Sequence, residues 1–306
     1  MNKKTLYTVV FFFLLSIFIG IQYLNTRWVS VNETNEGIFV FAAGTARLQE
    51  FFNEKKYNML SHIEGEVPVP RLFVRSVPKD FNKEKFDGVR PALFFEMLYP
   101  LILKANEEVE KHRGEIKILE KEFYDTGRLT EASRNKLNEW LVFYDVPESE
   151  DLSALFHRLL LRADTIAPTL LLSMAAQDSG FGTSRYAREY NALFNQQDWN
   201  GNGAVPDEKQ KEGPQYRIKT FPSLYDAVVS QIHYLNTYRT FENFRTARAK
   251  YRQTKQEIRG LALTYLLVNF PFKPIKYPDI IKYLILQYEL TPLDSRILEP
   301  IKNTAK

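Results

Sequence analysis

The chain of 306 residues carries 41 Lys and Arg against 37 Asp and Glu, a formal net charge of +4 with a pI near 8.9. Three of the surplus charges lie in residues 1–28, so the remainder is +1, and a nucleic-acid-binding function is disfavoured because neutralising several phosphates needs a clustered basic excess. The absence of Cys excludes disulfides and thiol catalysis, and four His without an HExxH spacing argue against zinc. We therefore expect no metal and no cofactor, while the oligomeric state stays undetermined.

The N-terminal residues predict a membrane anchor. The segment between Lys4 and Arg27 has 22 uncharged residues, and its apolar part, residues 5–24, is long enough to cross a hydrocarbon core about 30 Å thick. Because Lys3 and Lys4 precede it, we expect a single-pass protein of the cytoplasmic (inner) membrane whose C-terminal body lies in the periplasm or extracytoplasmic space. A cleaved signal peptide is the alternative, although its apolar region would be shorter and would end in an A-x-A-like site.

The next part of the chain divides at its prolines. After the anchor at residues 1–28, residues 29–66 have mixed composition and are interpreted as a spacer. Residues 67–150 are expected to form a helical N-terminal region. Its elements are a short strand, a long amphipathic helix bent near Pro100 and a second helix, at residues 71–74, 93–123 and 130–144.

A second, mostly helical domain is expected over residues 151–295, followed by a tail at 296–306. Ser149 is expected to cap its first helix, and Pro168 to open an almost wholly apolar helix that stops at Gly180. Further helices are predicted near residues 184–188, 223–235, 241–251, 257–268 and 278–288. Residues 191–221, with a turn at Asn200-Gly201-Asn202-Gly203, form the one expected β-hairpin.

Asp178 is the first candidate for chemistry. It ends the apolar helix on the face that should be buried, and both burial and the negative helix C-terminus raise the pKa of a carboxyl group. A carboxyl group of raised pKa can protonate a glycosidic oxygen near neutral pH. The alternative is that Asp-Ser-Gly only ends the helix by local hydrogen bonding.

Other motifs are weaker. Residues 198–203 resemble the start of a calcium-binding loop, but position 12 is Lys209 where a Glu is required, so a glycine-rich turn is the better interpretation. The chain has no GxSxG elbow and no phosphate-binding glycine loop. Aromatic and amide residues over 181–199 suit a sugar-binding groove, and core packing explains several of them equally well.

Residues 172–187 read LSMAAQDSGFGTSRYA and are followed by Asn191-Ala192-Leu193-Phe194. This run resembles the Bax-type bacterial peptidoglycan N-acetylglucosaminidases, with their mannosyl-glycoprotein endo-beta-N-acetylglucosaminidase-like domain, in which the stretch reads AQAAxESGWGTSRFA and then NNLFG. The resemblance covers about residues 67–290. Within that range it includes Asn106 and Arg113, the segment Ile232-His233-Tyr234-Leu235-Asn236-Thr237, Phe244-Arg245 and Arg248.

The resemblance implies a lysozyme-like α+β glucosaminidase fold, mainly helical with a small hairpin. It also implies hydrolysis of peptidoglycan glycan strands at the β-1,4 links between N-acetylglucosamine and N-acetylmuramic acid, with Asp178 in the position of the catalytic acid. No second carboxylate is assigned, so retaining and inverting outcomes both stay open. The expected substrate-binding residues are Phe181, Tyr186, Asn191, Phe194, Phe270 and Tyr277.

Three departures from the family pattern bear on activity. The family Glu is Asp178, one methylene shorter; a family Tyr is Phe270, without the hydroxyl; and a family Gly is Asn195. Two readings therefore stay open beside the hydrolase: a catalytically degenerate protein that binds cell-wall glycan or an envelope partner without cleaving it, and a structural scaffold.

Overall fold

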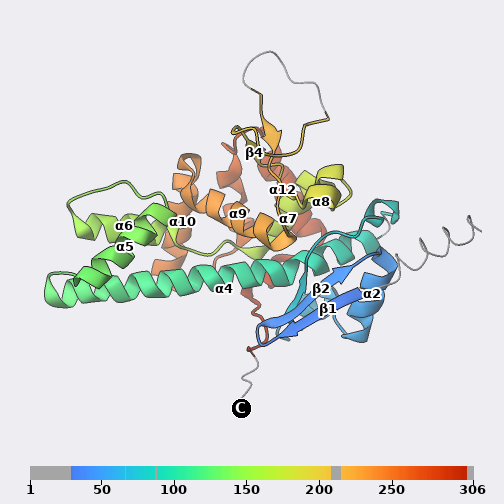
Figure 1. Cartoon of the computed structure of the whole chain (residues 1–306), viewed down its shortest axis with the longest axis horizontal. Helices are drawn as coiled ribbons and strands as arrows, with labels where there is room; N and C mark the ends of the chain where they lie inside the picture. Colours follow the sequence, from blue (N-terminus) through green and yellow to red (C-terminus); the bar gives the residue numbers. More distant parts are fainter. Residues whose placement is uncertain (1–28, 66, 87, 208–214, 302–306) are drawn as a thin grey trace, which may run out of the picture.

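The computed structural model describes residues 29–65, 67–86, 88–207 and 215–301 as a mainly helical body with two small sheets (Figure 1). The strands are β1 Val29–Thr34, β2 Gly37–Ala42, β3 Leu72–Val74, β4 Gln197–Asp198 and β5 Arg217–Ile218. The longer helices are α2 Thr45–Glu54, α4 Val89–Thr126, α5 Glu131–Phe143, α6 Leu152–Arg162, α7 Pro168–Ser179, α9 Leu224–Thr237, α10 Glu242–Gln253 and α12 Tyr277–Gln287. The short helices are α3 Met59–Glu64, η1 Phe81–Lys83, α8 Arg185–Tyr190, η2 Arg239–Phe241, α11 Gly260–Leu263, η3 Thr264–Leu267 and η4 Thr291–Ser295.

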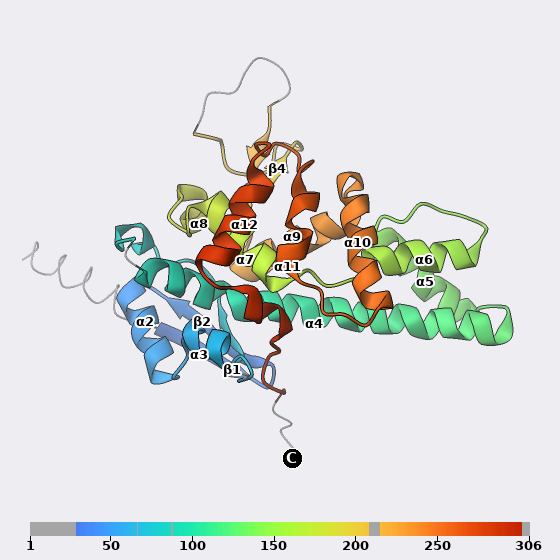
Figure 2. The ribbon, with the colours of Figure 1, turned by 180° about the vertical axis from the view of Figure 1, so that it is seen from behind.

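Helix α4 is the axis of the molecule. It is 38 residues long, and the sheet with α2 lies beside its first half while α5 and α6 lie beside its second half (Figure 1). Seen from behind, α12, α11 and α10 follow one another on the same side of α4 in this view, with α10 and α12 inclined to it (Figure 2). The predicted helix at 93–123 is therefore confirmed and extended at both ends.

Residues 29–64 are part of this body, although a spacer was expected there. Strands β1 and β2 form an antiparallel hairpin in which Val29 pairs with Ala42, and β3 adds to β2 in parallel, with Ile38 opposite Leu72. Val40 and Phe52 are almost fully buried in the main core. The alternation of apolar side chains in β2 is short and lies next to a polar strand, so the sequence pattern did not reveal the hairpin.

Buried side chains form two large apolar clusters. The larger one joins the sheet, α2, the first half of α4, α7, α9 and α12. The other joins the second half of α4 with α5 and α6, through residues such as Ile116, Trp140 and Phe156. This second cluster crosses the expected boundary between residues 150 and 151, and the domain limits themselves stay a prediction.

Several local predictions change in detail. Asp151, not Ser149, caps α6 by accepting bonds from the amides of Ser153 and Ala154. The helix expected over 257–268 is divided into α11 and the 3-10 helix η3. The expected hairpin over 191–221 is reduced to the two-residue pairing of β4 with β5 and an isolated bridge from Ala204 to Ile218.

The membrane-anchor prediction is corrected. Across the part of the chain that the structure describes, no helix combines the length and the apolar character needed to cross a membrane. This finding conflicts with the expected transmembrane helix and with the single-pass inner-membrane location that depended on it. Residues 1–28, on which the expected helix falls, lie outside the described residues.

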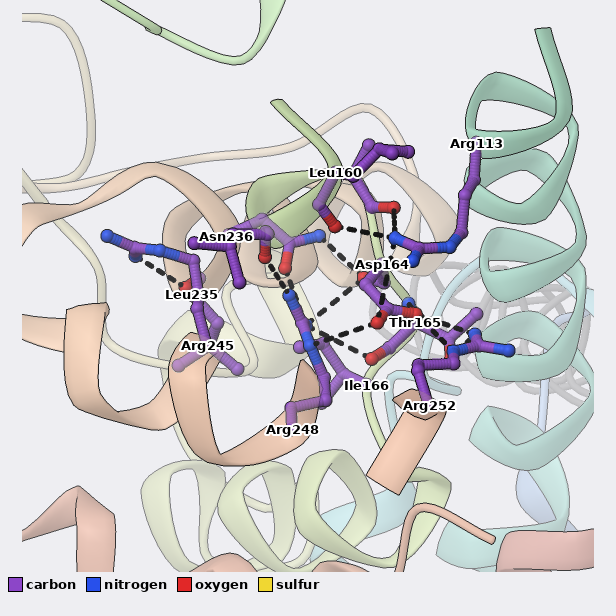
Figure 3. A network of polar contacts seen from close by, with 12 residues as sticks. Arg113, Leu160, Asp164, Thr165, Ile166, Leu235, Asn236, Arg245, Arg248 and Arg252 are labelled. Atoms are coloured by element: carbon purple, nitrogen blue, oxygen red, sulfur yellow. Dashed lines mark hydrogen bonds and ion pairs between the residues drawn. The ribbon is translucent and has the colours of Figure 1, made fainter. Parts of the chain in front are cut away.

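A cluster of polar side chains holds residues 160–166, the end of α6 and its link to α7 (Figure 3). Each of these side chains donates to one or more main-chain carbonyls of residues 160–166. These carbonyls accept no hydrogen bond within a helix, so they need partners from elsewhere. The donors come from three helices: Asn106 and Arg113 of α4, Asn236 of α9 and Arg248 of α10.

Asp164 is the charged centre of this cluster. Its side chain is 2% exposed, and its Oδ1 accepts from Arg252 Nε at 2.9 Å and Nη2 at 2.6 Å. Burial alone would raise the pKa of this carboxyl group, but Arg248, Arg252 and Arg113 hold the pKa below its usual value. Arg245 is also buried, and it donates to carbonyls at the end of α9. The arginines of the family-like motif therefore support the scaffold.

Pro100 lies inside α4 and cannot donate the helical hydrogen bond to the carbonyl of Glu96. The Tyr57 hydroxyl takes that place and donates to the Glu96 carbonyl at 3.1 Å. The Glu96 carboxylate in turn accepts from the Met59 amide at 2.9 Å. Tyr57 therefore supplies the hydrogen bond that Pro100 cannot give to the Glu96 carbonyl.

We predict that Tyr57→Phe lowers the free energy of unfolding by about 1–3 kcal/mol, because a buried carbonyl loses its donor. Urea denaturation followed by circular dichroism measures this change. Tyr124→Phe is the matched control, since Tyr124 is 62% exposed. An unchanged midpoint for Tyr57→Phe would contradict the role assigned to this hydroxyl.

Candidate active site

Helix α7 carries the candidate acid and is buried along nearly its whole length. Ten of its twelve residues are buried, among them Leu170–Ala176 without a break. At its start, Asp294 accepts from the Thr169 amide and hydroxyl, both at 3.0 Å, and from the Gly260 amide at 2.8 Å. A Cβ at residue 260 would stand 2.2 Å from the Thr169 hydroxyl oxygen, so only glycine fits there. The N-terminus of α7 is therefore fixed by a buried carboxylate.

The C-terminus of α7 is fixed as well. Gly180 adopts a left-handed conformation with φ 59° and donates its amide to the Ala176 carbonyl. Asn195, at the position of the family glycine, has φ 50° and donates its Nδ2 to the Asp178 carbonyl at 2.7 Å. Asparagine tolerates this conformation better than most residues, so this departure preserves the turn and adds a cap.

Asp178 projects from this end of α7 into a polar contact with the segment that precedes α12. Its side chain is 4% exposed, and Lys273 Nζ lies 2.6 Å from its Oδ2. The Tyr277 hydroxyl donates to the same oxygen at 3.2 Å. Both contacts use Oδ2, and within the described part of the chain Oδ1 accepts no hydrogen bond.

Burial raises the pKa of Asp178 to about 6, while the Lys273 ammonium and the Tyr277 hydroxyl act in the opposite direction. This is the direction that the sequence predicted from the end of a buried helix. The result is a carboxyl group that exchanges its proton close to neutral pH.

Phe270 packs against Tyr277 and lies near Lys273, the two residues that contact the Asp178 carboxyl group. Its ring is 7% exposed and packs edge-on against Phe241 at 5.0 Å and Tyr277 at 5.5 Å between centroids. Lys273 Nζ lies 5.7 Å from the centre of the same ring. Tyr277 keeps its hydroxyl directed at Asp178, so the retained tyrosine and not the lost one makes the contact to the acid.

A groove of about 600 Å³ opens beside these residues. Its wall is rich in aromatic rings and amides, which can stack on sugar faces and bond hydroxyl or acetamido groups. Trp199 and Phe272 are exposed by 51% and 73%, and their ring centroids are 6.2 Å apart. Lining residues from four parts of the chain include Tyr186, Phe194, Asn195, Gln196, Gln197, Trp199, Tyr216, His233, Tyr234, Phe270, Phe272 and Lys273.

The structure brings together most of the predicted site residues. Tyr186, Phe194 and Phe270 line the groove, and Tyr277 contacts Asp178. Their roles in binding a substrate stay predictions.

Phe181 and Asn191 lie elsewhere. The Phe181 ring packs among Phe94, Phe95 and Tyr288 on the side of α4. Asn191 ends α8 in a left-handed conformation and donates Nδ2 to the Phe221 carbonyl at 3.0 Å. Neither residue is among those that line the groove. Phe181 packs against core rings, the alternative that the sequence left open, and Asn191 stabilises the turn after α8.

Lys273 is the site residue that sequence reasoning missed. It lies in a proline-flanked segment after Phe270, where no periodicity indicates the direction of a side chain. Its one available signal was its place between Phe270 and Tyr277, two positions already named for the site.

The described residues contain no group of three or more His, Asp or Glu side chains placed to hold a metal ion. In the calcium-loop-like segment, Asp198 Oδ1 accepts from the Asn200 amide at 2.8 Å, as in a turn.

A buried carboxyl group with a raised pKa, separated by Lys273 from a groove lined by aromatic rings and amides, is compatible with an enzyme acting on glycans. Comparison with known proteins agrees with this class. Residues 156–290 match the family model described as mannosyl-glycoprotein endo-beta-N-acetylglucosaminidase. The chain is also similar to Protein bax of Escherichia coli (strain K12), with 28% identity over 211 residues that cover 69% of this chain and 73% of that protein.

Together these matches support a likeness of the chain to the Bax-type, glucosaminidase-like family, with the family model matching residues 156–290. At this level the family supports a glycosidase-type enzyme that acts on peptidoglycan or another glycan. No solved structure matches the chain significantly, and the lysozyme-like fold implied by the resemblance stays a prediction.

We predict that Tyr277→Phe raises the pKa of Asp178 above 6, on the order of half a pH unit, because the carboxylate loses one hydrogen bond. Carbon-13 NMR titration of the carboxyl group measures this pKa directly. Tyr283→Phe, at an exposed tyrosine of the same helix, is the control and should leave the titration unchanged. A lower pKa in Tyr277→Phe would contradict the assigned contact.

Proposed function

We propose that this protein is a peptidoglycan hydrolase that cleaves the glycan strand at N-acetylglucosamine, with Asp178 as general acid. The observation that carries the proposal is the burial of Asp178, with a pKa of about 6, beside the groove. A carboxyl group with this pKa is protonated in part of the molecules at neutral pH and can donate that proton in the transition state.

The reaction needs one proton transfer and one water. Asp178 gives its proton to the glycosidic oxygen as the bond from that oxygen to the anomeric carbon breaks, and the oxygen of water then bonds to that carbon. The proton released by the water balances the one that Asp178 gave up. Oδ1 is the atom proposed to carry the donated proton, because the contacts to Lys273 and Tyr277 both use Oδ2.

We predict that the purified full chain releases reducing sugar ends from peptidoglycan sacculi and that Asp178→Ala lowers the rate about a hundredfold or more. Asp279→Ala removes an exposed carboxylate from the first turn of α12 and is the matched control. Release that persists unchanged in Asp178→Ala would remove Asp178 from the role of acid.

A second candidate function is binding of cell-wall glycan without cleavage. It is favoured by the Lys273 ammonium, which lies 2.6 Å from Asp178 and favours its ionised form. In this case the protein sediments together with sacculi but releases no reducing sugar ends from them. Activity created by Asp178→Glu combined with Phe270→Tyr, in a parent chain that has none, would support this function over hydrolysis.

Both functions require a groove that holds sugar rings. We predict that Trp199→Ala weakens co-sedimentation with sacculi about fivefold, close to 1 kcal/mol, because an exposed groove-lining ring is lost. Tyr265→Ala removes a ring that is 64% exposed and is not among the groove-lining residues, so it serves as the control. Equal binding by the Trp199→Ala variant and the parent would show that the glycan lies elsewhere.

A further inference from the structure

Lys273 lies between the candidate acid and the groove. The Lys273 side chain is 13% exposed and lines the groove, whereas Asp178, at 4%, is not among the described residues that line it. A ligand that enters the groove therefore meets the ammonium before it meets the carboxyl group.

The backbone of Lys273 is held by a hydrogen bond, and its ammonium lies at the wall of the groove. Its amide donates to the Phe270 carbonyl at 3.2 Å, and its ammonium lies 5.3 Å from the centre of the Tyr277 ring. The ammonium also donates a long hydrogen bond of 3.5 Å to the Phe194 carbonyl. A lysine has a flexible four-carbon stem, so the ammonium can turn into the open groove while its backbone stays in place.

The charge of Lys273 works against acid catalysis. A neighbouring ammonium favours the carboxylate, but a general acid must hold a proton before it can give one. With the ammonium 2.6 Å away, the pKa of Asp178 is lower than burial alone would make it, so fewer molecules hold the proton near neutral pH. If the ammonium is removed while the carboxyl group stays buried, its lowering effect on the pKa of Asp178 is lost. The pKa is then expected to rise further, which means that the proton is bound more tightly.

Other charged groups of the groove are occupied elsewhere. Asp207 is paired with Arg185 at 2.6 Å, and Lys219 donates to the Ser230 hydroxyl at 2.9 Å. His233 has a pKa lowered by burial, so it is neutral near pH 7. Tyr277 faces Asp178 from α12 as a neutral hydroxyl at this pH, because burial raises its pKa far above the usual value. Among the described residues, Lys273 is therefore the charged group that forms an ion pair with Asp178.

We propose that Lys273 is a positioning residue that keeps Asp178 ionised while the groove is empty and turns aside when a glycan strand enters, so that Asp178 takes up a proton from solvent. This inference rests on the proposed role of Asp178 as general acid. It couples occupation of the groove to activation of the acid.

The test is the titration of the Asp178 carboxyl group, followed by carbon-13 NMR in the full chain. In Lys273→Met the pKa is expected to rise from about 6 to above about 7, because an opposite charge at this distance lowers a carboxyl pKa by about one to three pH units. Lys273→Arg keeps the cation and should restore a pKa near 6. Lys276→Met, which removes an exposed lysine three residues away, should leave the titration unchanged.

A titration of Lys273→Met that superimposes on that of the parent overturns the proposal, and so does a failure of Lys273→Arg to lower the pKa again. If Lys273→Met does not fold, Lys273→Gln has the same expected rise and the same contradicting result. The readout does not depend on cleavage. Absence of reducing-end release from sacculi with an intact Lys273 effect would remove the proposed hydrolase and leave the Lys273 contact established.

Discussion

The structure depends on how the link between α6 and α7 is held. Residues 160–166 have carbonyls that no helix or sheet satisfies, and the buried side chains of Arg113, Asn236 and Arg248 supply the donors. The guanidinium groups of Arg113 and Arg248 are buried near the single carboxylate of Asp164, and their Nη atoms donate to these carbonyls. Arg252, which is 33% exposed, binds the Asp164 carboxylate directly. Because the donors come from α4, α9 and α10, this one segment fixes three helices relative to α7.

The burial of α7 determines the chemistry at its C-terminal end. Because α7 is buried along most of its length, burial raises the pKa of Asp178 near its C-terminus and that of Asp294, the η4 residue that binds its N-terminus, each to about 6. Asp294 is satisfied by amides and a hydroxyl and serves the fold. Asp178 instead lies near the groove and is contacted by Lys273, which lines the groove, and by Tyr277, which is almost fully buried.

Much of the helical fold follows from sequence periodicity, and some of the site does too. The helix from Pro168 to Ser179, its stop at Gly180 and the raised pKa of Asp178 are features of a local pattern. The β1–β2 hairpin, the inward turn of Phe181 and the placement of Lys273 depend on contacts between segments far apart in the chain, and no local pattern contains them. The motif residues Arg245 and Arg248 were recognised by resemblance. Their hydrogen bonds to backbone carbonyls depend on the three-dimensional structure and could not be predicted from the motif.

The central claim is that a buried Asp178 delivers the proton that cleaves a glycan. Its most direct test is the pH dependence of reducing-end release from sacculi by the unmodified chain between pH 4 and pH 9. The account predicts that the rate falls as the pH rises through an apparent pKa near or somewhat above 6, because the acid loses its proton there. A rate that stays constant or increases from pH 5 to pH 9 would contradict it.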